Sequence, residues 1–448
     1  MRPFISLKPL AQRTHGQGLY VENVSLSDIL KQGQTPLYVT SLSAVAERIQ
    51  KYKNTLQSHF KNSNIFYACK ANFSQPILKE VLLAGGGIDI VSIGEWKAAL
   101  CAGYEPKNIC FAGVGKKEEE WKHTILNGLG YLNCEHLQEL EDILNFILTK
   151  KTELKTTPII SLRLNPCLAI ETHPHLKTGA LDSKFGILFS QFKDWLLSKQ
   201  QEYSTEQFLQ WIEPLKGIHV HIGSQLMEKE IFVHTVKSVF DCAQFLFEQQ
   251  VFINHLDLGG GLGVPLQGVP QNGEDIAKHV NFLCESIKNK SAFYPQLSLL
   301  WKKDFSNLFV CLEPGRSVVA SSTIFLTTVL YTKINAQDEQ RYQFCYVDGA
   351  MNDFPRPSLY GAEHYAELVN FAQLTQISAQ NLELSNWRVV GPVCESGDFL
   401  SKNSSLPNMV KNDVIAFFEA GAYCRSMASQ YNLRELPSEL FVKGDKIM

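Results

Sequence analysis

The chain contains the stretch Ile65-Phe66-Tyr67-Ala68-Cys69-Lys70-Ala71-Asn72. Its first four residues form a short apolar run, which predicts a buried β-strand. Lys70 follows that strand, where a buried ammonium is costly unless its pKa falls or its amine is used covalently. A desolvated lysine amine suits Schiff-base chemistry, whereas a lysine whose stem covers apolar surface simply reaches solvent. This stretch alone leaves both interpretations open.

A regular alternation of short β-rich runs and helical stretches extends outward from this strand. Amphipathic stretches such as Pro76–Ala84, Glu95–Ala102 and Leu137–Leu148 separate the runs. The runs predict strands at Ile65–Ala68, Ile88–Val91, Ile109–Phe111, Tyr131–Asn133, Ile159–Leu164, Gly217–His221, His255–Leu258 and Phe309–Glu313. Strands alternating with helices over about 250 residues predict an α/β fold, the (β/α)8 barrel.

Beyond residue 320 the pattern changes to strands without regular intervening helices. They are expected at Ile324–Lys333, Tyr342–Val347, Trp387–Val390 and Val414–Phe418. We therefore predict a second, mostly antiparallel β domain, and interpret the polar stretch Ser401–Ser405 as a loop. The β-like pieces Leu19–Val21 and Leu37–Val39 are expected to add strands to it. The predicted organisation is residues 1–40 joining the β domain, 41–320 forming the barrel and 321–448 forming the C-terminal β domain.

The composition excludes several classes of protein. The 448 residues are 45% hydrophobic and 19% charged with a net charge of −3, so no basic field indicates nucleic-acid binding. Eleven cysteines are scattered without a Cys-x-x-Cys pair, which is typical of reduced thiols. No secretory signal or membrane span is apparent, because the apolar segment Val318–Leu330 is short and interrupted. We expect a cytoplasmic protein.

The unusual residues of the barrel follow its predicted strands. In this fold the active site lies at the carboxyl ends of the strands. The residues are Lys70 after the first strand, Asp89 and Glu95 at the second, His221–Ser224 at the sixth, Asp257–Gly261 at the seventh and Glu313–Arg316 at the eighth. Agreement at several strands is hard to obtain by chance, so we predict one active site at this end of the barrel.

Three of these features together predict a cofactor. The glycines Gly259, Gly260 and Gly261 could be a flexible turn, but barrels often bind phosphate in the loops after strands seven and eight. Backbone N–H groups approach an anion closely where side chains are absent, and Arg316 beside this loop is expected to face one. Glu313 needs a cationic partner in the barrel interior, which a protonated pyridine nitrogen would supply. A lysine, an anion cradle and this acid describe pyridoxal 5′-phosphate.

His219 and His221 stand two residues apart, so on a strand they would point the same way. They could be core histidines or, alternatively, metal ligands. Because no acidic or thiol cluster in the sequence completes a metal site, we expect no metal.

The chain resembles the barrel-type pyridoxal-phosphate-dependent amino-acid decarboxylases, and within them the diaminopimelate decarboxylase family. The resemblance covers nearly the whole chain. Its motifs are Tyr67–Asn72, Arg163–Pro166, His173 with Thr178-Gly179, Lys184–Gly186, His219–Gln225, Leu256–Gly261, Glu313–Arg316, Arg356–Tyr360, Gly391–Asp398 and Gly421–Tyr423. Departures are small: Ile93 stands where a glycine is common, and Cys69 replaces a more usual aliphatic residue.

The resemblance implies a role for each site residue. Lys70 is implied to hold the cofactor covalently, and His221 to stack on its ring. Asp89, Ser224, Gly259, Gly260, Gly261, Glu313, Gly315, Arg316 and Tyr423 are implied to complete the cofactor site. Arg316, Arg356, Tyr360, Glu395 and Tyr423 are implied to bind substrate, and Cys394 to act as the catalytic acid. Cys394 and Glu395 would serve the partner subunit's site, so a homodimer with shared active sites is expected.

The implied activity is decarboxylation of meso-2,6-diaminopimelate to L-lysine, with pyridoxal 5′-phosphate as cofactor and no nucleic-acid or membrane partner. A first alternative is decarboxylation of another basic amino acid, such as ornithine, lysine or arginine. Arg356 speaks against it, because those substrates lack a distal carboxylate. A second alternative is a non-catalytic binding homologue, which would be expected to lose Lys70, Cys394 or the glycine loop. A barrel racemase is the third, and the Cys394-Glu395 motif favours decarboxylation over it.

Overall fold

The computed structural model describes residues 4–7, 18–167, 183–227, 230–267, 273–337, 340–370 and 384–448. The chain forms two compact units. One, the barrel unit, comprises residues 48–263 and 273–315; the other, the β unit, comprises 1–47, 264–272 and 316–448. The predicted domain boundaries at residues 40 and 320 stay predictions. Among the described residues, no helix has the length and apolar character needed to cross a membrane.

The barrel unit contains a closed ring of eight parallel strands, so the predicted fold class is confirmed. In ring order the strands are β5 (Ser63–Ala68), β6 (Gly87–Ile90), β7 (Ile109–Phe111), β8 (Tyr131–Cys134), β9 (Ile159–Asn165), β11 (Leu215–His219), β12 (His255–Asp257) and β13 (Phe309–Leu312). The ring closes where β13 pairs with β5. A short extra strand, β10 (Ile187–Leu188), pairs with β9.

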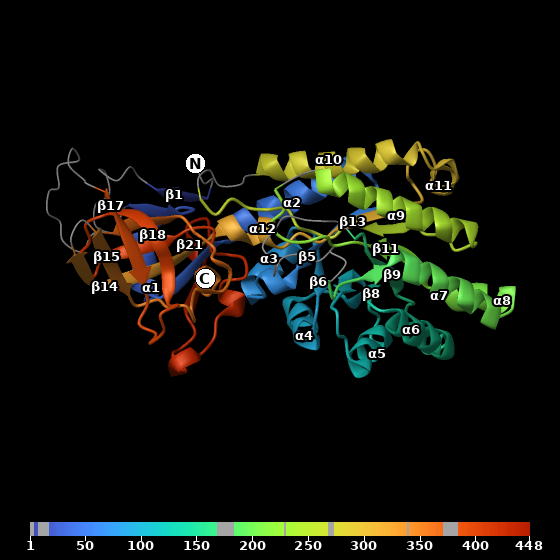
Figure 1. Ribbon diagram of the computed structural model, residues 1–448, viewed down its shortest axis with the longest axis horizontal. Coiled ribbons are helices and arrows are strands. Elements are labelled where there is room, and N and C mark those ends of the chain that lie inside the picture. Colours follow the sequence, from blue (N-terminus) through green and yellow to red (C-terminus); the bar gives the residue numbers. More distant parts are fainter. Residues whose placement is uncertain are drawn as a thin grey trace. The chain divides into compact units, whose positions relative to one another are not determined.

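Helices connect the strands and surround them (Figure 1). They are α2 (Leu42–His59), α3 (Gln75–Leu83), α4 (Ile93–Ala102), α5 (Glu118–Leu126), α6 (Leu137–Lys150), α7 (Phe189–Glu202), α8 (Thr205–Ile212), α9 (Glu230–Glu248), α10 (Gly273–Ser291) and α11 (Pro295–Leu300). The Ser92 hydroxyl accepts a hydrogen bond from the Glu95 N–H at 3.2 Å, as its spacing predicts. The Glu95 carboxylate reaches one residue further back than in a capping box and accepts the Val91 N–H.

The barrel interior carries an aromatic layer close to the amino ends of the strands. The rings of Tyr131, His255 and Phe309 stack on one another at centroid distances of 5.2–5.8 Å. Phe66, Cys110 and Cys311 pack in the same buried cluster. This layer fills the barrel with apolar contacts, so the charged groups described below are confined to the other end.

The β unit is built around a mostly antiparallel sheet, also as predicted. Its strands are β4 (Leu37–Ser41), β14 (Thr323–Gln337), β15 (Gln340–Val347), β16 (Ala366–Asn370), β17 (Leu384–Val390), β18 (Phe399–Pro407), β19 (Val414–Phe417), β20 (Ser438–Lys443) and β21 (Lys446–Ile447). The amino-terminal strand β4 lies between β14 and β20, so it joins this sheet. The predicted strand Leu19–Val21 instead forms a separate small sheet, β2 with β1 (Ile5–Leu7) and β3 (Val24–Ser25), beside α1 (Leu26–Gln32).

The interpretation of Ser401–Ser405 as a loop was wrong. These residues lie inside β18, which pairs antiparallel with β17 along most of its length. β18 is an edge strand, and Leu400, Leu406 and Ser404 turn inward while the other polar side chains are exposed or half-buried. A strand that pairs with only one other strand tolerates such polar residues, so its composition resembles that of a loop.

Candidate active site

Lys70 and Asp89 face each other at the carboxyl ends of adjacent strands. Lys70 lies in the short 3-10 turn Cys69–Ala71 directly after β5, and Asp89 lies in β6. The Lys70 Nζ is 3.3 Å from Asp89 Oδ2, with 37% of the lysine side chain exposed and the carboxylate fully buried. Burial and the nearby Glu313 charge raise the pKa of the Asp89 carboxyl to about 8, although the Lys70 charge opposes the rise. The Lys70 side chain is thus partly exposed, and its amine contacts a buried carboxyl group.

Glu313 is a buried carboxylate whose two oxygens both have side-chain partners. Its Oε2 lies 3.1 Å from Nε2 of His219, and its Oε1 accepts a hydrogen bond from the Asn133 amide at 3.2 Å. Burial by itself would raise the pKa of Glu313, but the neighbouring His219 and Lys70 outweigh it and lower the pKa below its usual range. Glu313 therefore stays ionised, with its charge held at the end of β13.

Asp257, the last residue of β12, is a site residue that the sequence analysis did not assign to the cofactor or substrate. Burial and the Glu313 charge raise its pKa well above the usual range. Its Oδ1 accepts the Gly259 N–H at 2.8 Å, and its buried Oδ2 has no partner among the described residues. If Oδ2 carries a proton, its O–H group can donate a hydrogen bond. Two neighbouring acids with pKa values pushed apart are a feature of catalytic sites.

The structure brings acids close to His219 that the sequence analysis did not group with it. Ligand atoms of His219, Asp257 and Glu313 lie within 4.8 Å of one another, and Cys110 groups in the same way with Asp89 and Glu313. These groups come from separate strands, so their spacing along the chain conceals their proximity. Hydrogen bonding within the set accounts for the contact of His219 with Glu313 without an ion.

β11 ends at His219, whose ring contacts Glu313, so His221 lies beyond the strand. The His221 Nδ1 instead accepts a hydrogen bond from the Gly260 N–H at 3.1 Å. Burial lowers the pKa of His221 well below its usual range, and the positive charges of Arg163 and Lys70 lower it further. The ring is consequently neutral at neutral pH, with Nδ1 as acceptor and the proton on Nε2.

The glycine loop is shaped first by the chain's own packing. Gly259 and Gly261 have φ values of +62° and +109°, and a Cβ on Gly260 would lie 2.3 Å from the Glu313 carbonyl oxygen. The N–H groups of Gly259 and Gly260 are already bonded to Asp257 and His221. Those of Gly261 and Gly315 have no acceptor within the described ranges, so these two amides are the ones available to an anion.

A second cluster of predicted residues lies in the β unit. Arg316 begins α12 (Arg316–Val319), Arg356 begins α13 (Arg356–Tyr360), and both side chains are buried. The guanidinium of Arg316 lies 4.8 Å from the centre of the Tyr423 ring, and that of Arg356 lies 5.4 Å from the Tyr360 ring. Burial and the nearby Arg356 charge lower the pKa of Arg316 to about 10, so it remains charged at neutral pH.

This second cluster needs an anion. Arg356 forms no ion pair with any described carboxylate, although its side chain is only 3% exposed. A buried guanidinium without a counter-charge is costly. The pair of arginines is therefore a candidate binding site for a carboxylate or phosphate group.

Cys394 and Glu395 lie together on the exposed loop between β17 and β18. The Tyr431 hydroxyl donates a hydrogen bond to Glu395 Oε1 at 2.5 Å. Asp398 fixes the loop by accepting the N–H groups of Met351 and Val393, both at 2.7 Å. Tyr431 and Asp398 were not predicted as site residues. Asp398 belongs to a motif of the resemblance, which could have pointed to it.

The remaining motifs support the site in part. Glu135 forms an ion pair with Arg163 and accepts a hydrogen bond from the Gly186 N–H at 2.9 Å. It therefore connects the motifs Arg163–Pro166 and Lys184–Gly186, although it belongs to neither. Ser224 is half-buried beyond β11. His173, Thr178 and Gly179 lie outside the described residues. The structure therefore brings Lys70, Asp89, His221, Gly259–Gly261 and Glu313 together in the barrel unit, and Arg316, Arg356, Tyr360 and Tyr423 in the β unit. The chain passes from one unit to the other between Gly315 and Arg316.

Comparison with known proteins agrees with this arrangement. The family model for the pyridoxal binding domain of pyridoxal-dependent decarboxylases matches residues 42–320. Diaminopimelate decarboxylase of Aquifex aeolicus is 34% identical over 96% of this chain and 91% of its own length. The chain belongs to the diaminopimelate decarboxylase family. The Archaeoglobus fulgidus member is 33% identical over 96% of this chain and 92% of its own length.

Solved structures of the diaminopimelate decarboxylase family share the architecture. The Helicobacter pylori enzyme, crystallised with L-lysine, has a TM-score of 0.77 and 32% identity, covering 94% of this chain and 95% of its own. A lysine/ornithine decarboxylase of Vibrio vulnificus has a TM-score of 0.71 at 18% identity, covering 93% of this chain and 97% of its own. The second likeness shows the fold alone.

Proposed function

We propose that this protein decarboxylates meso-2,6-diaminopimelate to L-lysine and carbon dioxide, with pyridoxal 5′-phosphate as its cofactor. The observation that carries the proposal is the group formed by Lys70, Asp89 and Glu313 at one end of the barrel. It combines an accessible amine with one buried acid that stays ionised and another that takes up a proton near neutral pH. Family membership supports the choice of substrate.

The residues present fit the cofactor. Lys70 would hold it covalently, His221 and Tyr423 would contact it, and Glu313 would face its ring nitrogen. The unbonded N–H groups of Gly261 and Gly315, with Ser224 and Arg316, would receive its phosphate. When bound, pyridoxal 5′-phosphate supplies a ring that stabilises negative charge on the substrate's α-carbon.

The protein's own groups control the protons around that ring. The ionised Glu313 stabilises a proton on the group that it faces, and His219 and Asn133 hold its oxygens in place. The raised pKa of Asp257 favours its neutral form, which adds no second negative charge beside Glu313. His221 stays neutral and so does not oppose a protonated ring. Cys394 is proposed to return a proton to the carbon that loses its carboxylate.

Recognition of the distal end of the substrate is proposed for the β unit. A distal carboxylate suits the buried guanidinium of Arg356, with Arg316 adding positive charge. Glu395 is proposed to hold the distal ammonium, in a loop that Tyr431 and Asp398 fix. We further propose that Cys394 and Glu395 act in the partner's site of a homodimer.

Substrate choice tests the proposed function. In a panel of amino acids, carbon dioxide release should be fastest from meso-2,6-diaminopimelate. Loss of one contact between buried charges costs about 2–5 kcal/mol, so lysine and ornithine should have a kcat/KM at least about 30-fold lower. A preference for ornithine or lysine would make the protein a decarboxylase of basic amino acids instead.

The cofactor attachment gives a second test. Borohydride reduction of the purified, cofactor-loaded protein should fix the cofactor to Lys70, and peptide mapping by mass spectrometry should find it there. Lys97, an exposed lysine on α4, serves as the internal comparison. A label on another lysine, or one that persists in the Lys70→Ala protein, would contradict the assignment.

A further inference from the structure

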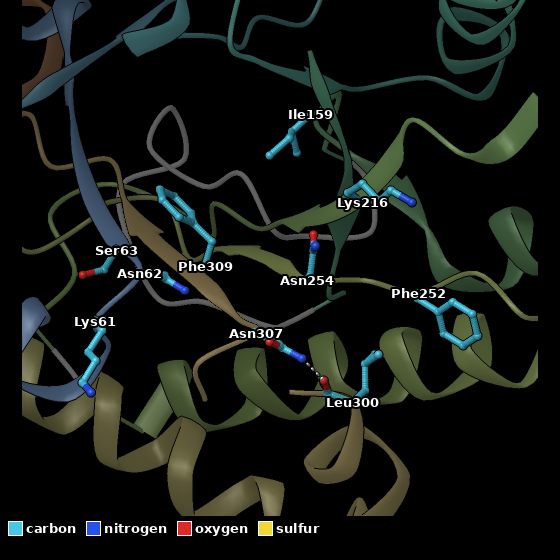
Figure 2. Close-up of a pocket in the computed structure, with 10 residues that line it drawn as sticks. All are labelled: Lys61, Asn62, Ser63, Ile159, Lys216, Phe252, Asn254, Leu300, Asn307 and Phe309. Atoms are coloured by element: carbon cyan, nitrogen blue, oxygen red, sulfur yellow. Dashed lines mark hydrogen bonds between the residues drawn. The ribbon is translucent and has the colours of Figure 1, made fainter. Parts of the chain in front are cut away.

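A pocket of about 670 Å³ lies at the amino ends of barrel strands, whereas Lys70 follows the carboxyl end of β5. Figure 2 shows the residues that line it. Its residues stand at the beginnings of strands, not at their ends. They are Lys61, Asn62 and Ser63 at β5, Ile159 at β9, Lys216 in β11, Phe252 and Asn254 before β12, Leu300 and Asn307 before β13, and Phe309 at its start. These five strands are consecutive in the ring, so the pocket occupies one arc of its amino-terminal rim.

The pocket is separate from the proposed active site. Phe309 begins β13 and Glu313 follows the end of that strand. Four residues of strand span roughly 13 Å. Between them lies the aromatic layer, where the Phe309 ring stacks on His255 at 5.2 Å. A molecule in this pocket would therefore contact Phe309 without reaching Glu313 or Lys70.

The side chains that line the pocket carry positive charge, which favours binding of an anion. The lining contains two lysines and no acidic side chain. Figure 2 shows Lys61 and Lys216 on opposite sides, with Asn254 between them in this view. Lys61 has no ion-pair partner among the described residues, and Lys216 has Glu213 at 3.3 Å, with half of that side chain exposed. An ion pair this exposed is weak, so Lys216 can exchange it for a ligand.

The polar groups between the lysines can receive oxygen atoms. The Asn62 and Asn307 amides already donate to the carbonyls of Ser306 and Leu300, which fixes their orientation (Figure 2). The Asn254 side chain has no hydrogen-bond partner in the part of the chain that the structure describes. Its N–H groups are available to a carboxylate, sulfonate or phosphate oxygen.

The rest of the lining is apolar. Ile159, Phe252, Leu300 and Phe309 supply aliphatic and aromatic surface, and Phe252 is 47% exposed. The volume falls within the range of about 300–1,000 Å³ that is usual for small-molecule sites. Such a mixture accommodates a hydrophobic body that carries a negative group.

We propose that this pocket binds a small organic anion with an apolar body, such as an aromatic carboxylate. Asn254 and Lys61 contact the anionic group, and Phe252 and Phe309 contact the body. The inference does not depend on the proposed function, because no residue of the pocket belongs to the active site.

Calorimetry with a matched pair of probes tests the proposal. The cofactor-loaded protein, with L-lysine present at a saturating concentration, is titrated with 2-naphthoate and with the neutral 2-naphthamide. The expected result is binding of one equivalent of 2-naphthoate, with the amide at least about tenfold weaker, since a hydrogen bond to a charged group contributes about 1.5–3 kcal/mol.

Two pairs of variants locate the binding. Asn254→Asp adds a negative charge at almost unchanged size and should weaken 2-naphthoate about tenfold or more, whereas Asn254→Gln should weaken it less. Lys61→Gln should weaken it, and Lys97→Gln, on exposed α4, should not. Unchanged decarboxylase activity would show that each variant is folded. Absence of 2-naphthoate binding, or equal binding by the wild-type and Asn254→Asp proteins, would overturn the proposal.

Discussion

A mixture of Lys70→Ala and Cys394→Ala proteins should regain decarboxylase activity that neither protein has alone. Each change removes a group that is proposed to act directly on the reaction, so each protein should lose activity about 100-fold or more. The two residues lie in different compact units, and Cys394 is exposed on its loop. If the sites are shared in a two-fold dimer, one site of a mixed dimer combines an intact Lys70 with an intact Cys394.

The size of the recovery is set by random pairing. About half of the dimers would be mixed after complete exchange, each with one intact site of two, so activity should approach about a quarter of wild type. The measurement is carbon dioxide release before and after subunit exchange, with exchange verified by differently tagged subunits. A mixture of Lys70→Ala with Lys70→Cys is the matched control and should stay inactive. No recovery despite proven exchange would mean that each site is built within one chain.

Arg356→Ala should lower kcat/KM for diaminopimelate about 30-fold or more. The side chain is buried and has no carboxylate partner among the described residues, so its charge is available to a bound substrate. Removing one member of a buried charge pair costs about 2–5 kcal/mol. The loss should fall on diaminopimelate and spare the residual turnover of lysine or ornithine, which lack the distal carboxylate.

This split between substrates separates recognition from structural damage. A misfolded protein would lose activity toward every substrate, and its melting temperature would fall. Arg356→Lys keeps the charge but not the planar fork, so it should retain more activity than Arg356→Ala. Equal kcat/KM values for diaminopimelate in the wild-type and Arg356→Ala proteins would remove Arg356 from the proposed site.

Much of the fold could be predicted from local pattern. The eight barrel strands were all expected within two residues of their observed beginnings and ends, because buried parallel strands form short apolar runs between amphipathic helices. Prediction failed for β18, whose polar residues are tolerated at a sheet edge. Leu19–Val21 lies in the β unit as expected, but its pairing in a small sheet of its own was not predicted, since strand pairing depends on contacts distant in sequence.

The sequence by itself determined the barrel, the second β domain and the chemical groups that follow the strands. The local hydrophobic pattern shows which segments form buried strands and in which order they follow one another along the chain. Only the tertiary structure decided which of those groups form hydrogen bonds with one another and which shift one another's pKa. Asp257 has a raised pKa because it is buried and because β12 and β13 place it beside Glu313, and His219 reaches Glu313 from β11. The pocket that contains Lys61 and Asn254 likewise exists only where five strand beginnings meet. Electrostatic coupling and cavities depend on distances across the ring, which spacing along the chain does not fix.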